Sequence, residues 1–153
     1  MAENTRIEVE NTRIEVLEEI AARPLHSSVP YNINFIGGAL AVSSAKAEVP
    51  VAQPVPLADL VNYQEGSIVS RVLVGRETGT ITLFAFDEEQ ALSEHTAPFD
   101  ALVQMLEGEM EISIDRKPLS VKTGNVVLLP ANHPHALRAI TKSKMLLTMI
   151  RSS

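Results

Sequence analysis

The feature that most constrains the fold of this chain is a series of short apolar segments that begins near residue 67. Turn-forming residues separate them at regular intervals, namely Gly75, Gly79, Gly108, Asp115–Arg116 and Gly124. We expect strands at residues 68–74, 80–86, 101–106, 110–114, 119–122, 126–129, 135–139 and 145–150. Many short strands with this spacing are typical of an all-β sandwich or barrel.

One of these segments shows which kind of sheet to expect. Met110, Ile112 and Ile114 alternate with Glu111 and Ser113. Successive side chains of a strand point to opposite faces, so this strand has one buried and one wet face. Antiparallel sheets with one buried face favour a double-sheet jelly roll.

Residues 124–135 combine a glycine turn, an apolar strand, a proline-led loop and a histidine that opens the next strand. The segment reads GNVVLLPANHPH and resembles the second conserved motif of the cupins, a large family of small β-barrels. Gly124, Pro130 and His135 stand at positions typical of that motif. Asn132 stands where the family usually has a glycine.

The first cupin motif is expected upstream, and residues 94–108 resemble it. In the family this motif offers two histidines one residue apart, then a glutamate, then a glycine that ends the strand. Counting back from Gly108 puts His95 at the first histidine, Ala97 at the second and Ala101 at the glutamate. Two of the usual metal ligands are therefore methyl groups. The resemblance covers roughly residues 57–153 and implies an all-β, double-stranded β-helix or jelly-roll barrel.

The resemblance implies that His95 and His135 meet at the open mouth of the barrel. Neutral imidazoles there suit one divalent transition metal, such as iron, manganese, nickel, copper or zinc. Catalytic metal sites commonly have three protein ligands. His133 is the candidate for a third ligand, and its alternative is an exposed loop histidine. For His95 and His135 the alternative is a pair without metal that lines an apolar pocket.

The expected register also predicts the pocket below these histidines. If alternate residues of the strand face inward, Asp100 faces outward and needs a bulge to reach the site. Glu94 faces away from His95, and we assign it no catalytic role. The expected lining is Ala97, Ala101, Val103, Met105 and Leu129.

Composition limits the classes of partner. The net charge of −6 and the pI of about 5.2, without a cluster of Lys or Arg, disfavour nucleic acids and anionic membranes. The chain has no cysteine, so thiolate chemistry is excluded. Its longest apolar stretch, near residues 35–42, is too short to span a bilayer. We expect a cytoplasmic protein, with enclosure in a protein compartment as a further alternative.

The N-terminal third is organised differently. The sequence ENTRIEV occurs twice, at residues 3–9 and 10–16, and helix signals in the second copy predict an amphipathic helix within residues 1–24. This helix is either a local duplication without a partner or a segment that docks on a partner or shell protein. Prolines favour a linker at residues 25–56, before a barrel domain at 57–153. Residues 31–42 are apolar and suit an edge strand, a subunit contact or a loose segment.

Three functions are compatible with this sequence. The protein is a metal cupin with dioxygenase-like or isomerase-like chemistry, a non-catalytic module that binds or senses a small organic ligand, or a dimeric body recruited through its N-terminal helix. A homodimer is expected by resemblance to small cupins, some of which exchange N-terminal strands. Residues 57–61 are the candidate for such an exchange.

Overall fold

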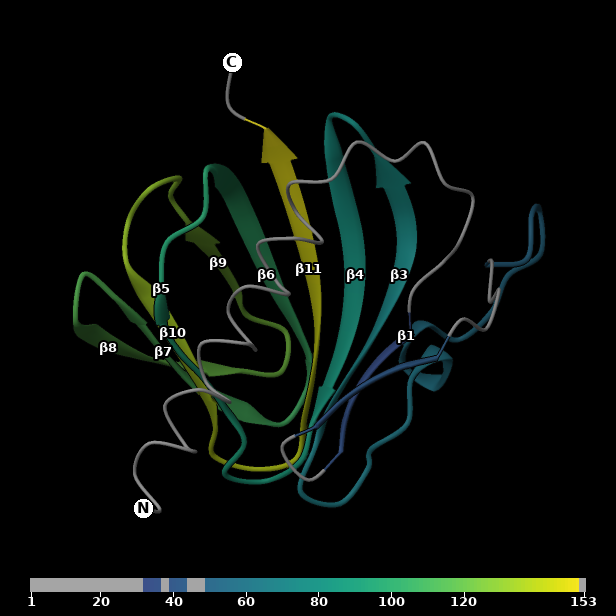
Figure 1. The fold of residues 1–153 in the computed structure, drawn as a ribbon, viewed down its shortest axis with the longest axis horizontal. Helices are drawn as coiled ribbons and strands as arrows, with labels where there is room; N and C mark the ends of the chain where they lie inside the picture. Colours follow the sequence, from purple (N-terminus) through teal and green to yellow (C-terminus); the bar gives the residue numbers. More distant parts are fainter. Residues whose placement is uncertain (1–31, 37–38, 44–48, 152–153) are drawn as a thin grey trace.

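Two antiparallel sheets face each other in the computed structural model, which describes residues 32–36, 39–43 and 49–151 (Figure 1). The larger sheet has the strand order β2 (Ala39–Ser43), β1 (Asn32–Ile36), β3 (Ile68–Arg76), β4 (Gly79–Phe86), β11 (Ser143–Arg151), β6 (Phe99–Glu107) and β9 (Val126–Leu129). The smaller sheet has the order β5 (Ala91–His95), β10 (His135–Ala139), β7 (Glu109–Ile114) and β8 (Lys117–Lys122). β11 lies between β4 and β6, as a jelly roll requires.

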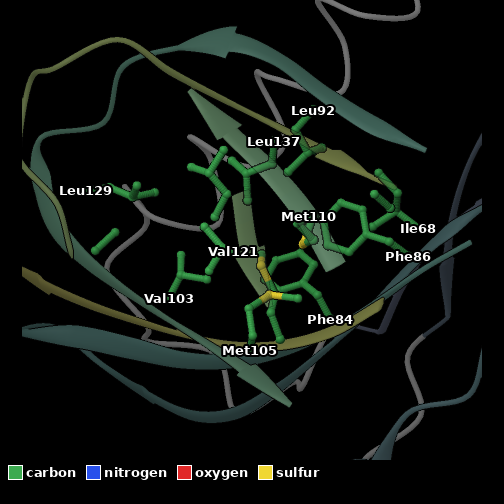
Figure 2. Packing of buried hydrophobic residues seen from close by; sticks show 14 residues of the cluster. Ile68, Phe84, Phe86, Leu92, Val103, Met105, Met110, Val121, Leu129 and Leu137 are labelled. Carbon is green, nitrogen blue, oxygen red and sulfur yellow. The ribbon is translucent and has the colours of Figure 1, made fainter. Parts of the chain in front are cut away.

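The inner faces of the two sheets form one apolar core. Figure 2 shows side chains of both sheets, among them Phe84 and Phe86 of β4 and Met110 of β7, projecting into the same interior. The fully buried members include Met110, Ile112 and Val103, each with no exposed area. Burial of these side chains is the main stabilising term of the barrel.

The outer face of the larger sheet is covered by the chain that precedes β3. A short 3-10 helix, η1 (Leu57–Leu60), and the buried Val61 pack over Leu83 and Ala85. The side chain of Arg71 donates a hydrogen bond to the carbonyl of Leu60 at 3.0 Å. In this chain residues 57–60 form a 3-10 helix that packs on the sheet of the same chain, and strand exchange between subunits stays a prediction.

All the strands expected from the sequence are present, and the all-β jelly roll is confirmed. β5 (Ala91–His95) was not expected from the sequence. In residues 31–42 the edge-strand alternative is the one found, since β1 pairs with β3 and with β2. The domain boundaries stay a prediction, and the helix expected within residues 1–24 lies outside the described residues. Within the described part of the chain, no helix is long and apolar enough to cross a membrane.

Candidate functional site

A β-bulge in β5 brings His95 to the inner face. His95 pairs with His135, and Leu92 pairs with Leu137, so three residue steps on β5 match two on β10. The extra residue on β5 lets both Leu92 and His95 face the interior, although regular alternation would turn one of them outward. The bulge therefore places the two histidines side by side.

Backbone carbonyls hold both imidazoles in one tautomer. Nδ1 of His95 lies 2.8 Å from the carbonyl oxygen of Ser93, and Nδ1 of His135 lies 2.9 Å from that of His133. A carbonyl oxygen only accepts, so each Nδ1 carries the proton and donates it. When the ring is neutral, its Nε2 is then left with a lone pair. The site thus presents two hydrogen-bond acceptors of fixed orientation.

The His135 ring is buried, with 5% of its surface exposed, and the His95 ring is partly exposed. The ring centroids lie 4.4 Å apart at an interplanar angle of 63°. Burial lowers the pKa of His135 below its ordinary value of 6.5, and the neighbouring His95 lowers it further, against the hydrogen bond to the His133 carbonyl. His135 is therefore neutral at neutral pH, which preserves its Nε2 acceptor.

A mostly apolar cavity lies beside the histidine pair. Its volume, taken as the space open to the centre of a water-sized sphere, is about 70 Å³. A single buried water needs about 10–15 Å³ on this measure, so the cavity has room for a small organic molecule. The described lining comprises Ser70, Val72, Thr82, Phe84, Leu92, His95, Ala97, Pro98, Ala101, Leu129, His135, Leu137, Met145, Leu147 and Met149.

The predicted lining residues divide into two groups. Ala97, Ala101 and Leu129 are on the cavity wall together with both histidines. Val103 and Met105 also face inward, but they pack within the core and do not reach the cavity. Their place is a correction to the sequence-based lining. Their direct partners on β11, Leu147 and Met145, line the cavity instead, so at this level the wall is formed by β11 rather than β6.

His133 points away from the cavity. Its Nδ1 lies 2.9 Å from Oδ2 of Asp115, and both side chains are about half exposed. The structure thus shows the exposed loop histidine that was the alternative to a third ligand. Asp100 also faces outward, and its carboxylate accepts a hydrogen bond from the Ala131 amide at 2.9 Å. Glu94 forms an ion pair with Arg116 at 3.6 Å on the surface.

The donor set falls short of a catalytic metal centre. Both imidazoles are oriented through Nδ1 as metal-bound histidines usually are. However, Ala97 and Ala101 supply only methyl groups to the wall, and catalytic metals usually have three protein ligands. Among the residues that the structure describes, no three His, Cys, Asp or Glu side chains are grouped to hold a metal ion. The described residues therefore do not complete a catalytic metal site by themselves.

Sequence reasoning missed the contribution of β3, β4 and β11 to the cavity. Thr82 of β4, Leu147 and Met149 of β11, and Ser70 of β3 all line it. The cross-strand register places Thr82 between Val72 and Leu147 on the inner face. The alternation within each strand indicated which residues face inward. Which inward-facing residues become neighbours depends on the order of the strands in the sheet. That order is set by contacts between residues distant in the sequence.

Comparisons with known proteins support the fold and the family. The sequence profile described as "Cupin domain" matches residues 82–151. A conserved protein of unknown function from Streptococcus pyogenes is 34% identical, with 69% of this chain and 92% of that chain covered and a TM-score of 0.66. The chain belongs to the cupin family. The expectation drawn from the two motifs is thereby confirmed.

Further cupins of known structure are similar to this one. A cupin superfamily protein from Desulfitobacterium hafniense is 29% identical, covering 68% of this chain and 95% of that one, with a TM-score of 0.65. A Cupin 2 conserved barrel domain protein from Leptotrichia buccalis is 44% identical over 62% of this cupin, with a TM-score of 0.61. This cupin spans 46% of the length of that protein. No curated protein matches the sequence.

Proposed function

We propose that this cupin binds a small, neutral organic molecule in the barrel cavity, with the Nε2 atoms of His95 and His135 as its polar anchor. The observation that carries the proposal is the pair of hydrogen bonds from Nδ1 to backbone carbonyls, at 2.8 and 2.9 Å. They leave two acceptors beside an apolar cavity. A few oriented polar groups in an apolar pocket are typical of a small-ligand site.

The lining supports a neutral ligand. The described cavity wall contains no Asp, Glu, Lys or Arg side chain. A charged ligand group would lose its water there without gaining an opposite charge, which is costly. His135 offers no compensating positive charge, because burial keeps its ring neutral. A hydroxyl or N–H group that donates to Nε2 suits the site better.

The test uses 4-methylphenol as probe and toluene as the probe without a hydroxyl. Methyl NMR signals of Met145 and Met149 report binding, since both side chains line the cavity. We expect saturable shifts with 4-methylphenol and weaker binding of toluene. Binding of neither probe would contradict the proposed function.

The variants His95→Asn and His135→Asn test the anchor. The amide nitrogen of asparagine takes the place of Nδ1 and keeps the bond to the backbone carbonyl, while Nε2 is lost. A hydrogen bond contributes about 0.5–1.5 kcal/mol, so each variant should bind 4-methylphenol about three- to tenfold more weakly. Toluene binding should change little. Equal losses for both probes would indicate a damaged cavity and contradict the anchoring role.

Metal binding is a second candidate because the same Nδ1 bonds leave both Nε2 atoms free to ligate. Such a metal would need its remaining ligands from water or from the bound molecule. Elemental analysis of protein purified without a metal-affinity tag tests this candidate. About one equivalent of metal in the parent, and none in either histidine variant, would support metal binding over direct binding of the ligand to the two imidazoles.

A further inference from the structure

We propose that the free edge of β9 pairs with β9 of a second copy of this chain, so that the larger sheets of two copies form one continuous sheet. β9 ends the strand order of the larger sheet and, among the described strands, pairs only with β6. A strand at a sheet edge presents unpaired N–H and C=O groups that can pair with another chain. The groups that β9 presents at this edge indicate which partner it fits.

The hydrogen bonds between β6 and the segment of β9 show which backbone groups face the free edge. The Met105 amide donates to the carbonyl of Asn125 at 3.0 Å, and the Met105 carbonyl accepts from the amide of Gly124 at 2.9 Å. In an antiparallel pair, residues that exchange hydrogen bonds alternate with residues that do not. Two steps along this ladder, Val103 and Val127 are therefore the next bonded pair.

Val126 and Leu128, on either side of Val127, consequently direct their N–H and C=O groups to the free edge. These groups have no hydrogen-bond partner within the described part of the chain. The side chains of Val126 and Leu128 lie on the outer face of the sheet and are 57% and 55% exposed. Each copy thus offers two donors, two acceptors and two exposed apolar side chains along one short edge.

β9 also lacks the features that protect a strand edge. β8, the edge strand of the smaller sheet, contains Lys117, Pro118 and Lys122. Charged side chains and proline on an edge strand are common means of preventing association. β9 contains neither, and residues 123–132 include no charged side chain. Two copies can therefore meet at β9 without placing like charges in the contact, although each chain has a net charge of −6.

The spacing of the free groups fits a second copy of the same strand. When a twofold axis passes beside Val127, antiparallel pairing sets Val126 opposite Leu128 of the partner subunit. Each opposed pair then exchanges both N–H···O bonds, and the neighbouring apolar side chains cover each other. The same surface is used on both copies, so the contact closes as a dimer. The ladder is short, so this dimer is weaker than an obligate one.

Sedimentation equilibrium of the full chain, at up to about 1 mM, measures the dimer dissociation constant, and even a millimolar dimer is detected there. Leu128→Lys introduces a charge into both opposed pairs and removes their leucines, so this constant should rise at least about tenfold. Ile150→Lys is the matched control. Ile150 is 60% exposed on the outer face of β11, which β6 separates from β9. This control should change the constant less than about twofold.

Complementary charges test the register of the pairing. In a mixture of Leu128→Lys with Val126→Glu, the two introduced charges lie opposite each other and the second pair keeps its apolar side chains. This mixture should associate about three- to tenfold more tightly than Leu128→Lys alone. A mixture of Leu128→Lys with Leu128→Glu is the control, because its introduced charges are not directly opposed. Equal association of the two mixtures would contradict the register.

Hydrogen exchange of single amides locates the contact. The amides of Val126 and Leu128 should be protected at high chain concentration and exchange freely at low concentration. The amide of Val127, which bonds to β6, should be protected at both.

Three results would overturn the inference. They are a parent that stays monomeric up to about 1 mM, a dimer that Leu128→Lys does not weaken, and protection of the Val126 and Leu128 amides in the monomer. The last result would show that another segment of the same chain occupies the edge. Val126→Lys, which alters the same opposed pairs, replaces Leu128→Lys if that variant does not fold.

Discussion

His95 and His135 are direct partners across β5 and β10, and their ring centroids lie 4.4 Å apart. Each ring donates from Nδ1 to a backbone carbonyl, so neither ring uses that proton to bond the other. Two neighbouring Nε2 acceptors of this kind can share one hydrogen-bond donor or one cation. In the proposed function a ligand hydroxyl takes that role, and no further metal ligands are needed.

Stability should depend on pH through His135. Its pKa in the folded protein is depressed below 6.5, first by burial and then by His95. In acid, His135 is protonated more readily in the unfolded chain than in the folded protein. The free energy of unfolding therefore falls as the pH falls. This contribution is present above the unfolded pKa and is lost as pH falls through the folded pKa.

Urea unfolding of the parent between about pH 7.5 and pH 5, a range that brackets the ordinary histidine pKa, measures this effect. The free energy of unfolding should fall toward pH 5, and His135→Asn should show a smaller fall. The same slope in both proteins would contradict this role of His135.

Asn132 should tolerate glycine but not alanine. Its φ of 64° is left-handed, and it begins the loop that leads to His135. Its amide also donates to the carbonyl of Ala97 at 2.8 Å, which ties this loop to the other cupin motif. Since an L-residue with a Cβ pays about 1–2 kcal/mol in this conformation, Asn132→Ala should lose about 1 kcal/mol of stability. Asn132→Gly should unfold at nearly the parental urea concentration, and a glycine variant as unstable as the alanine one would refute the explanation by backbone conformation.

We expect Lys144 and Tyr63 to stabilise the segment that covers the outer face of the larger sheet. Lys144 is 7% exposed, and its Nζ donates to the carbonyl of Ala58 at 2.8 Å and lies 5.0 Å from the centroid of the Tyr63 ring. Tyr63 donates to Glu107 at 2.8 Å. Burial and the Glu107 carboxylate raise the pKa of the Tyr63 hydroxyl, so it stays protonated as a donor.

Lys144→Met leaves the Ala58 carbonyl without its partner and should cost about 1–3 kcal/mol, while Tyr63→Phe should cost about 1 kcal/mol. Chemical denaturation measures both. Binding of 4-methylphenol should be unchanged, because these residues pack on the outer face and the cavity opens on the inner one. A variant that unfolds like the parent would show that this cluster does not stabilise the covering segment.

The fold was readable from the sequence because its signals are local. Alternation in residues 110–114 and the turns around Gly108 and Gly124 specify strands and hairpins over a few residues. β5 escaped prediction because its bulge breaks the period of two that reveals a strand. The same bulge is what turns His95 toward His135, so the irregularity belongs to the site.

The histidine pair could be predicted only through the resemblance to cupins, because its members lie on strands that are distant in sequence. The lining by Thr82 and Met149 could not be predicted, since it depends on β4 and β11 being neighbours in the larger sheet. A hydroxyl without a hydrogen-bond partner likewise cannot be predicted from the sequence, because its state depends on all the groups that surround it in the fold. The homodimer and the role of residues 1–24 stay predictions.

The most direct test of the central claim is titration of metal-depleted protein with 4-methylphenol, followed through the methyl signals of Met145 and Met149. We predict saturable shifts in the presence of a chelator, weakened by His95→Asn and His135→Asn and unchanged when zinc, manganese or iron(II) is added. Shifts that appear only after a metal is restored would contradict the account and assign the two imidazoles to a metal.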